Sequence, residues 1–263
     1  MLASLNGQVL PASEATVPIT DDGLLRGDGV FEVVRLYDGV PYALDEHLMR
    51  MSHSAENLRL PFAPEQFEQE VLALLDAAKP GDATMLRMVC TRGGNRIITV
   101  EPLPAVPETL ALITIRYSPT RVMDGIKSLS YGANMLVSRL AKEQGGDEGL
   151  LVTPHGRVLE GPRQSFVASL DGETLVTPPL DDHVLDSITR RRLLESGLVT
   201  ERPISADELP FATEAFLAST TREVHGVRSI DGVALPAAPG PLTQRAAEAI
   251  HEVIAAAVRQ PAA

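Results

Sequence analysis

Apolar residues recur every three or four positions in several stretches of the chain, which is the spacing of an amphipathic helix. Over residues 45–61 the apolar stripe begins behind Asp45, which is suited to cap a helix, and it stops before Pro61. The helix over 186–197 would be capped by Asp186 or Ser187. The same pattern predicts further helices over residues 64–78, 131–144 and 241–259.

Elsewhere apolar and polar residues alternate, as they do in half-buried strands. Two such runs flank Asp38-Gly39, a dipeptide that favours the tight turn of a hairpin. Similar turns are predicted at His155-Gly156 and Asp171-Gly172. Further strands are predicted over residues 83–93 and 108–118, in the stretch GIKSLS at 125–130, and from Thr220 and Thr221 onward.

These elements predict an α+β protein with two domains. Up to about residue 116 we expect two helices on one antiparallel sheet, which gives a small N-terminal α/β domain over residues 1–117. The stretch SPTRVMDG suggests a linker at 118–124, followed by a larger β-rich domain over 125–263.

Composition and charge exclude several classes of partner. The formal net charge is -12, whereas nucleic-acid binding needs a basic face. No apolar run reaches the roughly 18 residues of a membrane-spanning helix. Neither a signal peptide nor a metal-ligand spacing among the six histidines is evident. The single cysteine, Cys90, lies in an apolar run, which favours a reduced thiol and a cytoplasmic protein.

Lysine is rare in this chain, and one of its three lysines stands in an unusual place. Lys79 and Lys142 lie in polar, turn-like stretches, whereas Lys127 lies in the alternating stretch GIKSLSY. A lysine at the edge of a strand often keeps its ammonium group in water. Burial would instead lower the pKa of its amine, which suits a lysine that forms an imine.

Three other features change the balance between these two interpretations. The first turn of the helix at 186–197 offers free backbone N–H groups and hydroxyls, which suit a phosphate. Thr220 and Thr221 offer further hydroxyls, and Glu160 supplies a carboxylate before Gly161. An imine-forming lysine, a set of N–H and hydroxyl groups that can bind phosphate, and a carboxylate that can bind a pyridine nitrogen are together typical of a pyridoxal-phosphate (PLP) site.

Six stretches of the chain, taken in order, resemble one known family. They are GDGVFEVVRLYDG, LDEHLMRM, GIKSLSYGANML, GLLVTPHGRVLEGPRQSF, LVTPPLDDHVLDSITR and STTREVHGVRSIDG. The chain resembles the class IV aminotransferases, the fold-type IV PLP enzymes. These comprise branched-chain and D-amino-acid aminotransferases, (R)-selective amine transaminases and 4-amino-4-deoxychorismate lyases.

The resemblance implies a role for each matching position. Lys127 would be the Schiff-base lysine, and Glu160 would hold the pyridine nitrogen. Arg50 would bind the phosphate, while the backbone amide of Thr221 would face the substrate. The other cofactor-binding residues would be Ser165, Ile188, Thr189 and Thr220. The family also implies a cofactor at the domain junction, a homodimer, and amino-acid and 2-oxo-acid substrates.

The substrate is less clearly indicated than the cofactor. D-amino-acid aminotransferases grip the substrate carboxylate with an Arg-x-His pair, but Arg96 is followed two positions later by Ile98. Arg26 and Arg163 would make an alternative guanidinium clamp. Other candidate substrate-binding residues are Phe31, Arg87, Tyr131 and Thr221. The pattern favours a transaminase for D-amino acids, with aminodeoxychorismate lyase, and then a branched-chain or (R)-amine transaminase, as alternatives.

Overall fold

A computed structural model describes residues 1–259, and their backbone forms two compact units. The first unit comprises Met1–Ala105, Ile126–Tyr131 and residues 256–259. The second comprises Val106–Gly125 and Gly132–Ala255. The domain limits derived from the sequence stay a prediction, because compact units of backbone need not be independently folding domains.

The first unit is built on a six-stranded antiparallel sheet with the order β2-β1-β6-β5-β3-β4. Asp38 and Gly39 both have positive φ in the β3–β4 hairpin, as the sequence predicts. The strands are β1 (Leu2–Leu5), β2 (Gln8–Pro11), β3 (Gly29–Tyr37), β4 (Val40–Pro41), β5 (Thr84–Thr91) and β6 (Arg96–Pro102).

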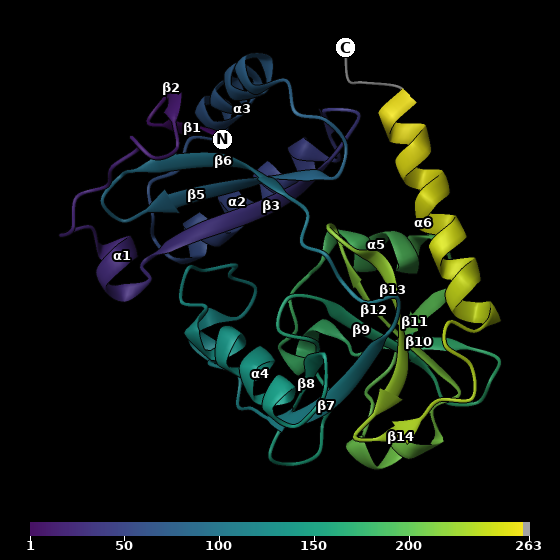
Figure 1. The fold of residues 1–263 in the computed structure, drawn as a ribbon. Coiled ribbons are helices and arrows are strands. Elements are labelled where there is room, and N and C mark those ends of the chain that lie inside the picture. Colours follow the sequence, from purple (N-terminus) through teal and green to yellow (C-terminus); the bar gives the residue numbers. More distant parts are fainter. Residues whose placement is uncertain (260–263) are drawn as a thin grey trace. The chain divides into compact units, whose positions relative to one another are not determined.

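Helices α2 (Leu44–Asn57) and α3 (Pro64–Ala78) pack on this sheet, and the short helix α1 (Asp22–Arg26) precedes β3 (Figure 1). Alternate residues of β3 are fully buried in the core beneath the helices, among them Val30, Val34 and Leu36. The cap predicted for α2 is wrong. The N-cap is Ala43, so Asp45 lies in the first turn, where a carboxylate interacts favourably with the helix dipole.

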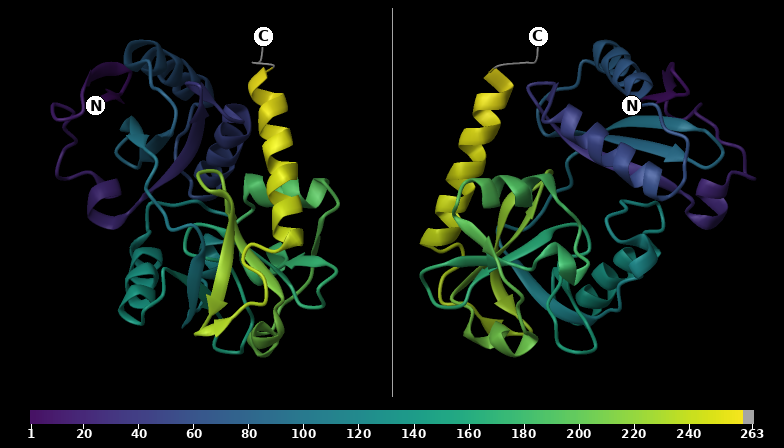
Figure 2. Two further views of the ribbon diagram at one scale, coloured as in Figure 1. Left: turned by 45° about the vertical axis from the view of Figure 1, so that its right-hand side comes forward. Right: turned by 180° about the vertical axis from the view of Figure 1, so that it is seen from behind.

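The second unit holds an eight-stranded mixed sheet with the order β11-β10-β9-β12-β13-β7-β8, to which β14 adds beside β13. Figure 2 shows this sheet from two further directions. The strands are β7 (Leu110–Arg116), β8 (Glu148–Val152), β9 (Ser165–Ser169), β10 (Leu175–Thr177), β11 (Val199–Glu201), β12 (Glu214–Ser219), β13 (Glu223–Ile230) and β14 (Val233–Ala234).

Three α-helices and three short 3-10 helices complete the described chain. Helix α4 packs on β7 and β8, which are parallel, and α5 connects the parallel strands β10 and β11. The first turn of α6 donates hydrogen bonds to the buried carboxylate of Glu214 on β12. These elements are α4 (Gly132–Glu143), α5 (Ile188–Glu195), α6 (Pro241–Arg259), η1 (Arg121–Met123), η2 (Leu180–Asp182) and η3 (Ala206–Phe211).

The α+β fold class is confirmed, but three strand predictions are wrong in detail. Strand β7 pairs with β8 and β13 in the second sheet, not in the N-terminal one. The stretch GIKSLS makes only an isolated bridge, at Ser128. Thr220 and Thr221 lie in the turn between β12 and β13 and not at the start of a strand.

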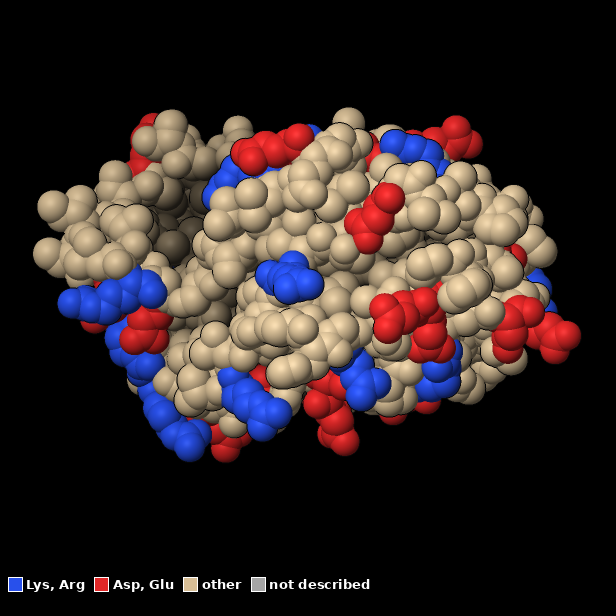
Figure 3. Space-filling view, turned by 90° about the horizontal axis from the view of Figure 1, so that it is seen from below, with Lys and Arg blue, Asp and Glu red and all other residues tan. Residues whose placement is uncertain are grey.

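Charged side chains of both signs are interspersed over the face shown in Figure 3. Within residues 1–259, no helix is long and apolar enough to cross a bilayer.

Candidate functional site

Backbone hydrogen bonds hold the segment that carries Lys127 against β3. The N–H of Phe31 donates to the carbonyl of Lys127 at 3.1 Å, and the N–H of Leu129 donates to the carbonyl of Gly29 at 2.9 Å. The N–H of Lys127 donates to Ser54 Oγ at 3.1 Å. The position of Lys127 is therefore fixed by the backbone of β3 and by one side chain of α2.

The ammonium group of Lys127 lies over two aromatic rings. Its Nζ is 4.3 Å from the ring centroid of Phe31 and 5.6 Å from that of Tyr131, and the rings meet edge to face at 5.0 Å. Such cation–π contacts orient a lysine without neutralising it. The structure thus brings together three residues that the sequence proposes for the site.

A buried ionic network lies around Glu32 on β3. The Nε and Nη2 atoms of Arg50 donate to the two carboxylate oxygens of Glu32 at 2.6 and 2.7 Å. His47 Nδ1 lies 2.7 Å from Glu32 Oε2, and both side chains are fully buried. This bidentate geometry orients the guanidinium group of Arg50, the predicted phosphate ligand.

The protonation states of this network follow from its surroundings. Burial by itself would raise the pKa of Glu32, but the charge of Arg50, and then His47, hold it far below its ordinary value. Burial lowers the pKa of His47, and the neighbouring Glu32 only partly offsets this. An ionised Glu32 only accepts hydrogen bonds, so His47 Nδ1 is the donor. The buried Nε2 of His47 has no hydrogen-bond partner among residues 1–259.

We expect these shifted pKa values to make the folded state less stable at acidic pH. Below about pH 6.5 the unfolded chain binds a proton at His47 that the folded chain does not bind. The free energy of unfolding should therefore fall as the pH decreases, by up to about 1.4 kcal/mol per pH unit for one proton. Glu32 adds a further loss once the pH falls below its ordinary value of 4.5.

Urea titrations between pH 7.5 and 5 will measure this slope. His47→Gln should flatten it, whereas His53→Gln, which changes an exposed histidine of the same helix α2, should leave it as in the wild type. An equal slope in the wild type and the His47 variant would contradict the assignment.

In the second unit, one edge of the sheet gathers the remaining predicted cofactor ligands. Strands β9 and β12 are antiparallel, and Ser165 at the start of β9 pairs with Ala218 near the end of β12. Strand β10 runs antiparallel to β9, so it ends at this same edge, from which the chain continues to α5. The turn that holds Thr220 and Thr221 follows β12 at this edge too.

This edge offers several groups that suit a phosphate. Ile188 and Thr189 form the first turn of α5, where no carbonyl of the helix can accept from their N–H groups. Ser187 caps the helix, as predicted, by accepting from the N–H of Arg190. The hydroxyl of Ser165 is buried and has no hydrogen-bond partner within the described chain. A buried hydroxyl without a partner is rare and indicates a bound group or water.

Glu160 lies just before Gly161, where the chain approaches β9. The N–H of Leu185 donates to its carboxylate at 3.2 Å. Burial raises the pKa of the neighbouring Tyr117, and the negative charge of Glu160 raises it further. A half-buried carboxylate in this setting fits a protonated pyridine nitrogen.

The residues present therefore fit PLP. Lys127 and Arg50 lie in the first unit, whereas Glu160, Ser165, Ile188, Thr189 and Thr220 share one edge of the sheet in the second. An imine-forming amine, anion donors and a carboxylate are the groups that this cofactor requires.

The four arginines predicted to bind substrate all form ion pairs. Arg87 pairs with Glu101 through two hydrogen bonds, and Arg96 pairs with Glu70 at 2.7 Å. Arg26 pairs with Asp22 on the exposed helix α1. Arg163 pairs with Glu148 at 2.9 Å while its side chain stays 41% exposed. Their roles toward substrate stay predictions.

Comparison with known proteins agrees with this site. The family model for amino-transferase class IV matches residues 29–230, which is most of the chain. The chain belongs to the class IV aminotransferases. It is accordingly a PLP-dependent aminotransferase, and the cofactor inferred from the sequence is confirmed.

Relatives with three different names match this class IV aminotransferase along most of its length. A protein named as a branched-chain-amino-acid aminotransferase of Methanocaldococcus jannaschii is 34% identical over 87% of both chains. The D-alanine aminotransferase of Bacillus licheniformis is 31% identical over 97% of both. The bifunctional aminodeoxychorismate lyase / D-amino acid transaminase of Mycobacterium tuberculosis is 29% identical over 98% of this chain and 99% of its own.

Solved structures of the same fold include a PLP-bound form. A hypothetical aminotransferase from Mycobacterium tuberculosis in that form has a TM-score of 0.88 at 27% identity, covering 97% of this chain and 99% of its own. The branched-chain aminotransferase of Thermoproteus uzoniensis with norvaline has a TM-score of 0.90 at 26% identity, covering 99% and 97%. The fold-type IV prediction is thereby confirmed.

Several residues around the site were not singled out from the sequence. His47 stands three residues before Arg50, so both lie on one face of α2. Glu32 occupies a strand position whose neighbours on the same face, Val30 and Val34, are apolar. A carboxylate at such a position is a detectable sign of a buried ionic network. No pattern in the sequence marks Arg222, which directly follows Thr220 and Thr221.

Proposed function

We propose that this aminotransferase moves amino groups between D-amino acids and 2-oxo acids. The observation that favours amino acids over simple amines as substrates is the position of Arg163. Its partly exposed guanidinium group stands in the turn just before Ser165, at the sheet edge that also holds Thr220 and Thr221. There it can bind the carboxylate that distinguishes an amino acid from a simple amine.

Each site residue would have its own role in binding the cofactor or in moving a proton. When bound, PLP supplies the aldehyde that takes up the amino group and a ring that accepts electrons from the substrate carbon. Lys127 holds the cofactor and moves the proton of the substrate Cα as base and acid. Glu160 keeps the pyridine nitrogen protonated. Arg50, Thr220, Ser165 and the first turn of α5 hold the phosphate.

Relatives support the choice of D-amino acids. The D-alanine aminotransferase of Bacillus licheniformis is 31% identical over 97% of this chain. The bifunctional relative of Mycobacterium tuberculosis is named for D-amino acids as well. We propose a cytoplasmic homodimer on the family resemblance, together with the single buried thiol of Cys90, whose pKa burial raises to about 11.

The second candidate function is aminodeoxychorismate lyase. Both reactions begin with removal of the Cα proton, and the bifunctional relative carries both names. A lyase substrate has a further carboxylate on its ring, and an arginine such as Arg163 suits that group equally well.

A spectroscopic half-reaction will test the proposal. Cofactor-loaded protein is mixed separately with D-alanine, D-glutamate, L-leucine, L-glutamate and (R)-1-phenylethylamine. We expect the yellow absorbance to bleach with the D-amino acids, because the cofactor then takes their amino group. Bleaching with L-leucine alone would make the protein a branched-chain enzyme. If no donor bleaches the yellow band, aminodeoxychorismate is tested next, and release of pyruvate would establish the lyase.

A further inference from the structure

Arg222 is a half-buried arginine with no assigned role. It occupies the turn between β12 and β13, immediately after Thr220 and Thr221. Within residues 1–259, its guanidinium group makes no hydrogen bond and no ion pair. A guanidinium group carries five N–H donors, and within the described chain those of Arg222 are available to an acceptor from outside.

A buried carboxylate holds the side chain of Arg163. It belongs to Glu148, the first residue of β8, and β8 and β13 are the two strands that pair with β7. Glu148 is only 2% exposed, and it accepts from Ser138 Oγ at 2.5 Å, from the N–H of Gly149 at 3.2 Å and from Arg163 at 2.9 Å. These bonds hold one end of the Arg163 guanidinium group in place.

Arg222 and Arg163 lie close enough to influence each other. The turn that holds Arg163 leads into β9, and the turn that holds Arg222 follows β12, the strand paired with β9. Burial lowers the pKa of Arg222, the positive charge of Arg163 lowers it further, and the charge of Glu148 raises it. Arg163 thus bonds to the buried carboxylate of Glu148, and Arg222 lies close enough to feel the charges of both groups.

We propose that Arg222 and Arg163 together bind a carboxylate group of the amino-acid substrate, with Glu148 positioning Arg163. Two guanidinium groups bind a carboxylate through directed, charge-assisted hydrogen bonds, which no neutral amine can form. The pair would therefore select substrates by their carboxylate. This proposal rests on the aminotransferase function proposed above, and it names the residues that set its specificity.

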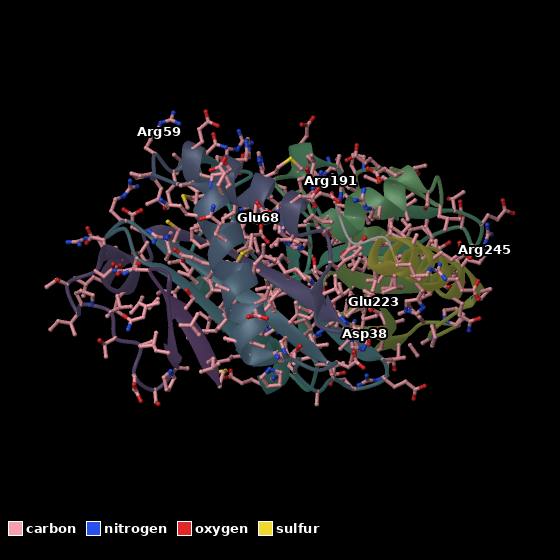
Figure 4. All side chains as sticks on the ribbon, turned by 90° about the horizontal axis from the view of Figure 1, so that it is seen from above. Asp38, Arg59, Glu68, Arg191, Glu223 and Arg245 are labelled. Atoms are coloured by element: carbon pink, nitrogen blue, oxygen red, sulfur yellow. The ribbon has the colours of Figure 1, made fainter. Side chains whose placement is uncertain are left out.

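The test compares Arg222→Gln with Arg245→Gln. Arg245 is exposed on α6, so its variant removes the same charge away from the proposed site (Figure 4). Half-reaction rates are measured with (R)-1-phenylethylamine, alanine and glutamate, using the enantiomer of each amino acid that the wild type accepts. We expect Arg222→Gln to slow the amino acids by about 10- to 100-fold, the effect of losing hydrogen bonds to a charged group, and to leave the amine unchanged. Arg245→Gln should change none of the three.

The pattern of loss identifies which carboxylate is bound. An equal loss with alanine and glutamate assigns the pair to the α-carboxylate, whereas a loss with glutamate alone assigns it to the side-chain carboxylate. Unchanged rates with both amino acids would overturn the proposal. So would an equal loss with the amine, because that indicates a merely structural role.

A binding measurement separates this proposal from the proposed reaction. Calorimetry follows the binding of glutarate, which has two carboxylates and no amino group, to the cofactor-loaded protein. We expect the wild type and Arg245→Gln to bind it alike and Arg222→Gln to bind it about 10-fold or more weakly. Equal binding by all three proteins would overturn the carboxylate subsite. If no amino acid reacts but this difference appears, the reaction is wrong and the subsite stands.

Discussion

Lys127→Ala will abolish amino-group transfer and remove the visible absorbance of the lysine-bound cofactor. In the proposed function the side chain supplies both the covalent link and the base, so we expect the rate to fall by roughly 10⁴-fold or more. The fold should survive, because the hydrogen bonds from Lys127 to β3 and to Ser54 come from its main chain. Absorbance spectra of the purified protein with added PLP, together with the half-reaction, measure both losses.

The scarcity of lysine gives this experiment unusually clean controls. Lys79 and Lys142 are exposed, and their alanine variants should keep the spectrum and the rate of the wild type. Borohydride makes the bond between lysine and cofactor permanent, after which mass spectrometry should find the added mass on the peptide that contains Lys127. An unchanged spectrum in Lys127→Ala, or the added mass on another peptide, would refute the assignment.

Glu32→Gln will have the largest expected effect on stability. The change removes the charge of the buried carboxylate to which the largely buried Arg50 donates two hydrogen bonds. Breaking a buried ion pair by removing one partner typically costs about 3–5 kcal/mol. Urea unfolding without added PLP measures this free energy, so that ligand binding does not contribute. Cofactor affinity should fall as well, because Glu32 orients the guanidinium group of Arg50.

Glu101→Gln is the matched control in the same sheet. Glu101 also accepts two hydrogen bonds from an arginine, Arg87, but this pair is partly exposed, with the carboxylate side chain 24% accessible. Exposed ion pairs contribute about 1 kcal/mol or less. If both variants lost the same small amount, the network around Glu32 would not depend on its charge.

Local rules explain which parts of the fold could be predicted from the sequence. Helix α3 begins at Pro64 and ends at Ala78, the range that its apolar spacing indicates. The turns at Asp38-Gly39 and Asp171-Gly172 form because aspartate and glycine favour turns, and Asp38, Gly39 and Gly172 have positive φ there. Each of these features depends on neighbours within a few positions, and such neighbours are visible in the sequence.

The partners of strands could not be predicted in the same way. Strand β7 has an alternating pattern that fits either sheet, and its parallel pairing with β8 depends on a crossover through α4. The stretch GIKSLS alternates like a strand but bonds to β3 only around Ser128. Pairing depends on residues far away in the sequence, so periodicity alone does not determine it.

In the candidate site, too, features that depend on nearby residues could be predicted from the sequence, whereas those that depend on distant residues could not. Lys127 stood out because lysine is rare, and the first turn of α5 stood out because helix termini bind anions. Glu148 and Arg222 are 74 positions apart in the numbering, and only the second sheet, in which β8 and β13 flank β7, relates them. No local pattern marks them, and their charges resemble those of ordinary surface residues.

The short return of the chain to β3 has a consequence for recombination between related genes. Residues 106–125 and 132–255 belong to the second unit, yet the six residues between them, which include Lys127, belong to the first unit and bond to its strand β3. A single crossover near residue 105 would combine β3 of one parent with the lysine segment of the other. Hybrid genes should encode an active protein only when Phe31 and the segment from Ile126 to Tyr131 come from the same parent. The segment should therefore evolve together with the N-terminal sheet, although the second unit surrounds it in the sequence.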